Sequence, residues 1–222
     1  MAMEHVDPGN DVDVGAGVHL TGWVRGHGNQ ISVADAEHGA TIRIAVSGNN
    51  NVVHVERAYA LKSPDIRIGN HVPAHRAHLQ IGANFSIESG GRVLLPNSGS
   101  RLVIGRDCMF SQDVTIRCGE SPLLIYDRDS GEYLDVGADV SIGNHVWPGE
   151  GVYVTKRARI TEESVVAARA VVTRRFDQPH TVLGGNPAAV VREGVTWVRN
   201  RGVLEEGGPR RASYDAHRKT YE

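Results

Sequence analysis

The chain has 222 residues and a formal net charge of −2, and 40% of it is hydrophobic although only 5% is aromatic. This length fits one domain with a long, narrow core, because little aromatic bulk is available to fill a wide one. The near-neutral charge argues against a strongly cationic nucleic-acid surface. No segment approaches 18 apolar residues and no basic, then apolar leader opens the chain, so we expect a cytoplasmic protein without a membrane span.

The first part of the chain gives weak structural signals. Residues 1–17 are polar and Gly-rich, and we expect a loose lead-in there. Residues 18–61 hold short β-rich runs that polar corners separate, notably the Ser-Gly-Asn-Asn-Asn run at 47–51. Asn and Gly tolerate the left-handed backbone conformations of sharp corners. These runs fit irregular coils of a solenoid whose register becomes regular from Ile68 onward.

A six-residue register is clearest between Val136 and Val172. Its first places are aliphatic or Pro, and its fifth places are Val or smaller. The first places are Val136, Ile142, Pro148, Val154, Ile160 and Val166, and the fifth places are Val140, Val146, Val152, Ala158, Ser164 and Ala170. Neither a helix, with period 3.6, nor a half-buried strand, with period 2, gives that pattern. It predicts an all-β fold, a parallel β-helix whose coils have three flat sides of about six residues.

The register breaks once, at residues 122–135, and ends after Val172. The break reads PLLIYDRDSGEYLD, and a solenoid tolerates such an insertion only as an extruded loop. Long loops on regular scaffolds often carry function. We therefore expect one β-helix domain at 18–192 and a charged C-terminal cap and tail at 193–222, with a short helix near Trp197.

The cysteines and one histidine group have plain structural interpretations. Cys108 and Cys118 form no CxxC pair, and Cys108 stands at a fifth place, where a small buried residue is expected. His71, His75 and His78 run around the corners of a coil, so we expect surface histidines and predict no metal site.

Several motifs together resemble the hexapeptide-repeat acyltransferases, especially the sugar and polysaccharide O-acetyltransferases. Ile142 to Trp147 is similar to the family's IGxxVW signature, and 125–132 resembles the extruded active-site loop of the polysaccharide branch. The run 165–173 looks like the penultimate coil, and 185–188 with Arg192 looks like the closing GNPA…R motif. The resemblance implies a left-handed β-helix, a homotrimer with active sites between subunits, and acetyl-CoA as co-substrate rather than a tightly bound cofactor.

The resemblance also implies donor-binding positions. Trp147 is expected near the pantetheine arm, Ala168 and Thr173 along it, and Arg174 and Arg192 near the CoA phosphates. The charges agree, since CoA is strongly anionic and cations with backbone N–H groups bind such ligands.

The chain departs from the family where catalysis is expected. The family's general base is a loop histidine, which falls here at Pro122 or Leu123, and neither residue takes a proton. Glu150 stands where the family keeps a small or neutral residue, and a carboxylate there repels phosphates. Arg169 replaces a small residue of the penultimate coil.

Replacement bases are Glu120, Asp127 and His145, or His75 or His78 from a neighbouring subunit. A carboxylate serves only if desolvation raises its pKa. For Asp127 we favour bonds to backbone N–H groups of the loop, and for His145 a solvated surface position.

The leading hypothesis is an acetyl-CoA- or acyl-CoA-dependent O- or N-acyltransferase that acts on a sugar or small metabolite. The first alternative is a catalytically silent relative that serves as a trimeric binding or scaffold module. The second is an acyltransferase whose donor is an acyl carrier protein.

Overall fold

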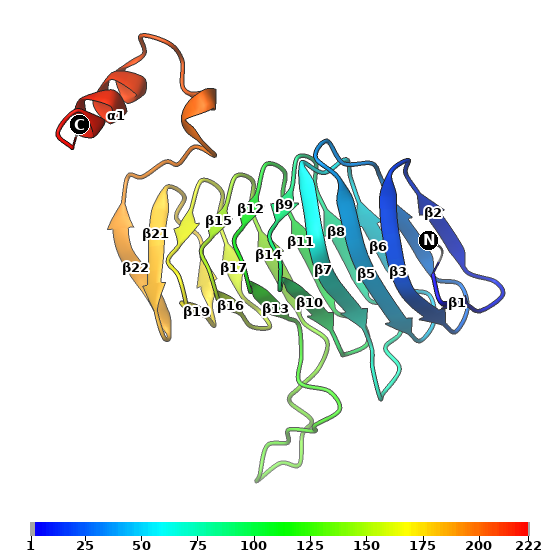
Figure 1. Cartoon of the computed structure of the whole chain (residues 1–222). Helices are drawn as coiled ribbons and strands as arrows, with labels where there is room; N and C mark the ends of the chain where they lie inside the picture. Colours follow the sequence, from blue (N-terminus) through cyan, green and yellow to red (C-terminus); the bar gives the residue numbers. More distant parts are fainter. Residues whose placement is uncertain (1–2, 222) are drawn as a thin grey trace.

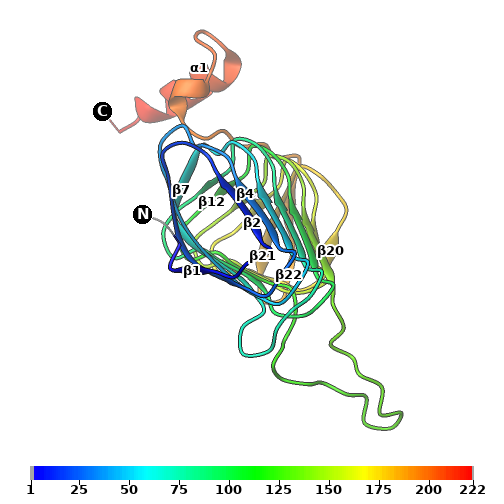
Figure 2. The same ribbon diagram turned by 90° about the vertical axis from the view of Figure 1, so that its right-hand side faces the viewer.

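The computed structural model describes residues 3–221 and forms a solenoid of short parallel strands with one helix near the C-terminus (Figure 1). Successive coils stack along one axis, and the view turned by 90° shows them superimposed around a narrow interior (Figure 2). The parallel β-helix that the six-residue register predicts is confirmed.

Three flat faces make up each coil. The first face contains β1 (His5–Val6), β3 (Val18–Arg25), β5 (Ala40–Ser47), β7 (Ala60–Ile68), β10 (Arg92–Leu95), β13 (Thr115–Arg117), β16 (Tyr153–Val154) and β19 (Val171–Val172). The second contains β2 (Asp11–Val14), β4 (Gln30–Val33), β6 (Val52–Val55), β8 (His78–Ile81), β11 (Arg101–Ile104), β14 (Asp139–Ile142), β17 (Arg159–Ile160) and β20 (Arg175–Phe176).

The third face starts at the beginning of β7 and continues through β9 (Ser86–Ile87), β12 (Met109–Phe110), β15 (Trp147–Pro148), β18 (Val165–Val166) and β21 (Thr181–Gly185). The step from β12 to β15 is made by the N–H groups of Met109 and Ser111, which donate to the carbonyls of Val146 and Pro148 at 3.1 and 3.0 Å.

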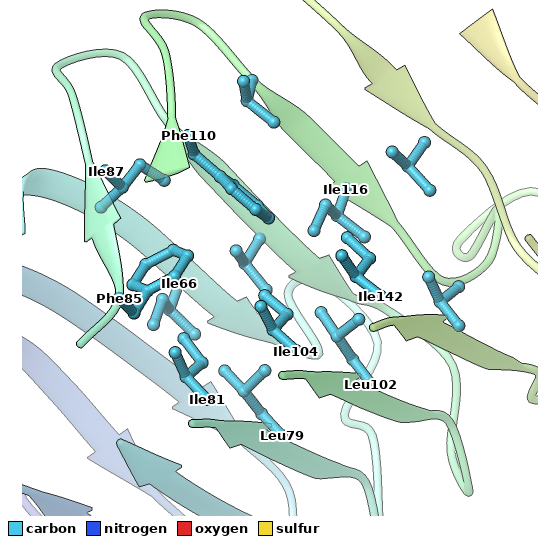
Figure 3. Close-up of a cluster of buried hydrophobic side chains, with 14 of the residues drawn as sticks. Ile66, Leu79, Ile81, Phe85, Ile87, Leu102, Ile104, Phe110, Ile116 and Ile142 are labelled. Atoms are coloured by element: carbon cyan, nitrogen blue, oxygen red, sulfur yellow. The ribbon is translucent and has the colours of Figure 1, made fainter. Parts of the chain in front are cut away.

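The core is the stack of first-place and fifth-place side chains. From Ile142 onward every first-place residue up to Val172 is buried, and every fifth-place residue from Val140 to Ala170 is buried. Neighbouring coils stack in the same way (Figure 3), where the rings of Phe85 and Phe110 meet edge to face with centroids 4.9 Å apart. Each buried aliphatic side chain contributes about 1.5–3 kcal/mol. Val136 is the exception, since it is 49% exposed where the extruded loop returns.

The expectation of a loose lead-in at 1–17 is wrong for the residues that the structure describes. β1 pairs with β3, and β2 pairs with β4 over its full length, from Asp11 opposite Gln30 to Val14 opposite Val33. Backbone pairing forms a coil here although the side chains do not follow the register. Residues 1–2 lie outside the described part.

The predicted extruded loop is present between β13 and β14 and projects far from the coils (Figure 1). Leu123 and Leu124 are 73% and 62% exposed. A backbone bridge between Tyr126 and Tyr133 closes the distal part. At the base, the buried Asp135 carboxylate accepts from Lys156 Nζ and from the Glu120 N–H, the latter at 2.8 Å.

The C-terminal end differs from the expected cap. β22 (Ala188–Glu193) pairs antiparallel with β21 and so provides a partner for the edge of the last coil. The chain then forms a 3₁₀ turn at Arg201–Val203 and the helix α1 at Pro209–Arg218, which stands away from the coils (Figure 1). The helix does not begin near Trp197, because Trp197 is buried against the coils in a segment that is neither helix nor strand. Within residues 3–221 no helix has the length and apolarity to cross a membrane.

Candidate active-site cleft

A cleft of about 870 Å³ lies along the third face. Strand register places Ala60, Ser86, Met109, Trp147 and Val165 in one outward row beneath it. Neighbouring strands lie about 4.8 Å apart, so this row is about 19 Å long. The cleft is thus a straight groove rather than a round pocket.

Small residues keep the groove open beside Trp147. Gly149, Ala167 and Ala168 line it, and a Cβ added at Gly149 would lie 2.9 Å from the backbone nitrogen of Ala168. Trp147 is half-buried, and its Nε1 donates to Ser111 Oγ at 3.1 Å. The indole therefore has a fixed orientation, and Ser111 is held beside it.

Residues 195–200, which we call the C-terminal strap, pack on the coils, and Arg199 and Asn200 of the strap line the cleft. Trp197 Nε1 donates to the carbonyl of His145 at 2.9 Å, and its ring stacks on the imidazole at 4.1 Å. The same indole lies 6.0 Å from that of Trp147. Further along, Arg199 Nη1 donates to Ser86 Oγ at 2.5 Å. The strap is held at both ends by coils that are far apart in sequence.

His145 is not the solvated surface histidine that its fourth place predicts. Its side chain is 26% exposed, and Nδ1 donates to Glu163 Oε2 at 2.9 Å. Thr196 Oγ1 donates to the same carboxylate oxygen at 3.2 Å. The strap covers His145, which the register alone does not reveal, and His145 is not among the residues that line the cleft.

Glu150 and Arg169, the two departures from the family pattern, face each other. Glu150 lines the cleft, and its Oε1 lies 3.9 Å from Arg169 Nη2. Both side chains are largely exposed, so the attraction is weak, but Arg169 offsets the negative charge beside the groove.

The five expected donor-binding residues fall on two sides of the protomer. Trp147 and Ala168 line the cleft. Thr173 and Arg174 occupy the corner between β19 and β20, which is the corner from which the extruded loop emerges two coils earlier, and Arg174 stacks over the ring of Phe176 at 5.1 Å. Arg192 is exposed on β22, opposite Val182.

The loop carboxylates lie on the loop side, away from the cleft of their own protomer. Asp127 Oδ1 accepts from the N–H groups of Asp129 and Ser130, at 3.0 and 2.7 Å, and from Ser130 Oγ at 2.9 Å. The backbone bond from Ser130 is the main cause of its lowered pKa. Glu120 Oε2 accepts from Arg117 Nε at 3.1 Å, and its side chain is 38% exposed.

His71, His75 and His78 are separated around their coil. His71 and His75 are exposed, and His75 Nδ1 accepts from the N–H of Asn49 at 3.1 Å. His78 opens β8 on the second face. None of the three lines the cleft.

Sequence reasoning missed the residues at the N-terminal end of the cleft. They come from four separate stretches of chain and are His38, Tyr59, Lys62, Glu88 and Arg199. His38 packs edge-on against Tyr59 with ring centroids 4.4 Å apart, and its Nε2 lies 3.4 Å from Glu37 Oε1. The register is weak before Ile68 and carries no information on the course of the strap. The sequence pattern therefore does not predict that these side chains lie close together.

A search of protein-family models found no match. The chain is 30% identical over 192 residues to a polysialic acid O-acetyltransferase of Neisseria meningitidis, covering 79% of this chain and 88% of that protein. It is 27% identical over 120 residues to the galactoside O-acetyltransferase of Escherichia coli, covering 54% and 56%.

Among solved structures, the polysialic-acid-specific acetyltransferase NeuO superposes with a TM-score of 0.76 at 23% identity, over 97% of this chain and 96% of the other. The polysialic acid O-acetyltransferase OatWY gives a TM-score of 0.73 at 23% identity, over 94% and 98%. These likenesses extend over the whole β-helix.

Proposed function

Because the chain belongs to the hexapeptide-repeat acetyltransferases, we propose that it transfers an acetyl group from acetyl-CoA to a hydroxyl or amino group of a sugar. The observation that carries the proposal is the straight groove beside Trp147, floored by Gly149 and Ala168. A pantetheine arm is long and thin, and such a groove suits it better than it suits a compact ligand. Relatives named for polysialic acid and galactosides support a sugar acceptor.

The proposed donor lies with its phosphates toward the C-terminal end of the groove. Arg192 is next to β21, two strands beyond Trp147 on the third face. The thioester then lies near Ser111, whose hydroxyl accepts from Trp147 Nε1 and keeps its own hydrogen available. That hydrogen is suited to stabilise negative charge on the carbonyl oxygen during transfer.

We propose a homotrimer because the two sets of residues lie on different sides of one protomer. The extruded loop, Thr173 and Arg174 share one corner, whereas Trp147 and Ala168 lie on the third face. A neighbouring copy is needed to bring the sets together. Contacts between two different surfaces of like subunits form a closed ring when the rotation closes.

In the proposed reaction, a base takes the proton of the acceptor hydroxyl while the oxygen attacks the thioester carbonyl carbon. The C–S bond then breaks, and the CoA sulfur leaves as a thiolate that takes up a proton. We assign the base to Glu120 on the loop, because only its Oε2 is bound, to Arg117. Asp127 and His145 are weaker candidates, since each is held by several contacts.

Acetyl-CoA is thus a co-substrate, and the proposal includes no tightly bound cofactor. A cytoplasmic location agrees with two free, buried cysteines.

A second candidate is a silent relative that binds CoA or a sugar without turnover. The exposed Leu123 favours it, because a side chain without a proton-accepting group stands where the family's histidine is expected.

Calorimetric titration with CoA tests the donor site. Ala168→Trp would fill the groove and weaken CoA binding at least tenfold, whereas Ala16→Trp, on an exposed corner of the first coil at the opposite end of the solenoid from Ala168, would leave binding unchanged. Equal binding by Ala168→Trp and the wild type would refute the donor site, and CoA binding without acetyl transfer to any acceptor would favour the silent relative.

A further inference from the structure

Arg199 is the one cation lining the cleft that has no acidic partner among residues 3–221. Lys62 Nζ lies 2.8 Å from Glu88 Oε1, and His38 Nε2 lies 3.4 Å from Glu37 Oε1. The remaining charged lining residue, Glu150, faces Arg169. Arg199 instead contacts only neutral groups, so its positive charge is not neutralised by a residue of the cleft.

The guanidinium of Arg199 is held firmly but not saturated. Nη1 donates to Ser86 Oγ at 2.5 Å and Nη2 to the carbonyl of Asn84 at 3.3 Å, while the group lies 4.2 Å from the centre of the Tyr59 ring. A guanidinium has five N–H donors. Three of them therefore have no acceptor in the described part of the chain, and the planar group is already oriented.

Arg199 is also partly removed from water. Its side chain is half-buried, and desolvation is the main cause of its lowered pKa. Asp107 does not pair with it, since that carboxylate accepts from Asn84 Nδ2 at 2.7 Å and lies 3.7 Å from Arg106 Nε. A half-buried charge without a counter-ion is energetically unfavourable. Such charges are common at ligand sites, where the ligand supplies the counter-ion.

The position of Arg199 separates it from the proposed CoA phosphates. Ser86, to which it is bound, lies two strands before Trp147, or about 10 Å along the axis. Arg192 adjoins the strand that lies two strands beyond Trp147 in the opposite direction. The two arginines therefore flank Trp147 from opposite ends, and Arg199 lies at the acceptor end.

We propose that Arg199 binds the carboxylate of an acidic sugar acceptor through a forked pair of N–H···O bonds. Guanidinium and carboxylate match in geometry, and charge-assisted bonds of this kind are about twice as strong as neutral ones. The assignment to the acceptor rests on the proposed function, because the donor's direction along the groove defines the acceptor end.

Equilibrium binding tests the carboxylate site without any need for turnover. The probes are the methyl glycosides of N-acetylneuraminic acid and galacturonic acid, each compared with its own carboxamide by calorimetry in the presence of CoA. Wild-type protein binds at least one acid at least tenfold more tightly than its carboxamide. Arg199→Met abolishes that preference, and Arg101→Met, an exposed arginine on the second face, retains it.

Two further measurements separate charge from folding. Tryptophan fluorescence, to which Trp197 contributes, reports whether the strap stays on His145 in Arg199→Met. Ser86→Ala removes the anchoring hydroxyl but keeps the charge, and it retains a preference for the acid.

Equal binding of acid and carboxamide by the wild type would overturn the inference. So would an acid preference that survives in Arg199→Met, or a loss of CoA affinity in that variant without any acid preference in the wild type, because Arg199 would then serve the donor. Acetyl transfer to neutral sugars alone would reject the carboxylate site and leave the proposed function standing. An Arg199-dependent acid preference without transfer to any sugar would support the site and reject the proposed function.

Discussion

At the scale of single residues, the two cysteines show how burial changes the pKa of a thiol. Burial raises the pKa of both Cys108 and Cys118 to about 12. The thiolate is the reactive form, so both thiols are unreactive near neutral pH. Cys108 also makes a hydrogen bond from its Sγ to the Gly143 carbonyl at 3.2 Å, which gives it a structural role.

We expect neither thiol to react with a disulfide reagent in the native protein at pH 7, and both to react after unfolding. Absorbance of the released thiolate measures this. Rapid labelling of native protein would contradict the burial of these residues, and slow labelling that Cys108→Ser removes would identify the site of opening.

Replacing the loop residue Leu123 by histidine tests the catalytic role of the loop. An imidazole at this place would provide a base that titrates near neutral pH. Leu123→His, or Pro122→His, is expected to raise acetyl transfer about tenfold or more, since a well-placed general base typically contributes about 10²–10⁴-fold. The rise should follow a single ionisation in the pH profile. Leu124→His, at the next exposed residue of the loop, is the control.

Glu120→Gln should have the opposite effect and lower turnover while CoA binding stays unchanged. If the Leu123→His variant loses activity, the native loop has a chemistry of its own.

At the scale of elements, the ion pair between Asp135 and Lys156 anchors the base of the extruded loop. Burial opposes ionisation of Asp135, but bonds from Lys156, Asn97 and the Glu120 N–H outweigh it and lower the pKa. A lowered pKa stabilises the fold above the unfolded-state value near 3.9, and this stability is lost as pH falls through the folded-state value.

Asp135→Asn should therefore destabilise the fold at pH 7 by about 3 kcal/mol, because it leaves Lys156 without its buried partner. The difference from wild type should shrink as pH falls below about 4. Urea unfolding at several pH values measures both effects. Asp129→Asn, at a 91% exposed loop position, is the control, and an equal loss in both variants would contradict the role of the buried pair.

The six-residue register predicted the coils well because each place has a single environment. Ile142 to Val172 are buried at the first places as expected, and the insertion at 122–135 projects outward. The strap was not predictable, since Trp197 and Arg199 are fixed by His145 and Ser86, more than 50 residues away in sequence. For the same reason the register predicts a solvent-exposed His145. The register does not predict β1 and β2, because backbone pairing rather than a side-chain pattern forms these strands.

At the scale of the whole molecule, we expect the protomers to assemble into a homotrimer. The exposed apolar residues of the loop, among them Leu123, Leu124 and Ile125, have no partner surface in one protomer that would explain them. We expect sedimentation equilibrium to give three times the chain mass of 24.0 kDa. Replacing residues 123–134 by a short Gly-Ser linker should weaken association and leave the coils folded. A wild-type monomer at micromolar concentration would contradict the shared site.

Acetyl transfer in the groove beside Trp147 can be tested directly. Purified protein is mixed with acetyl-CoA and a panel of neutral and acidic sugars, thiol release is followed, and acetylated products are identified by mass spectrometry. The wild type should acetylate at least one sugar, and Trp147→Ala should lower kcat/KM about 100-fold, in line with the sensitivity of transfer to positioning. No acetylated sugar despite CoA binding, or full activity in Trp147→Ala, would contradict acetyl transfer in this groove.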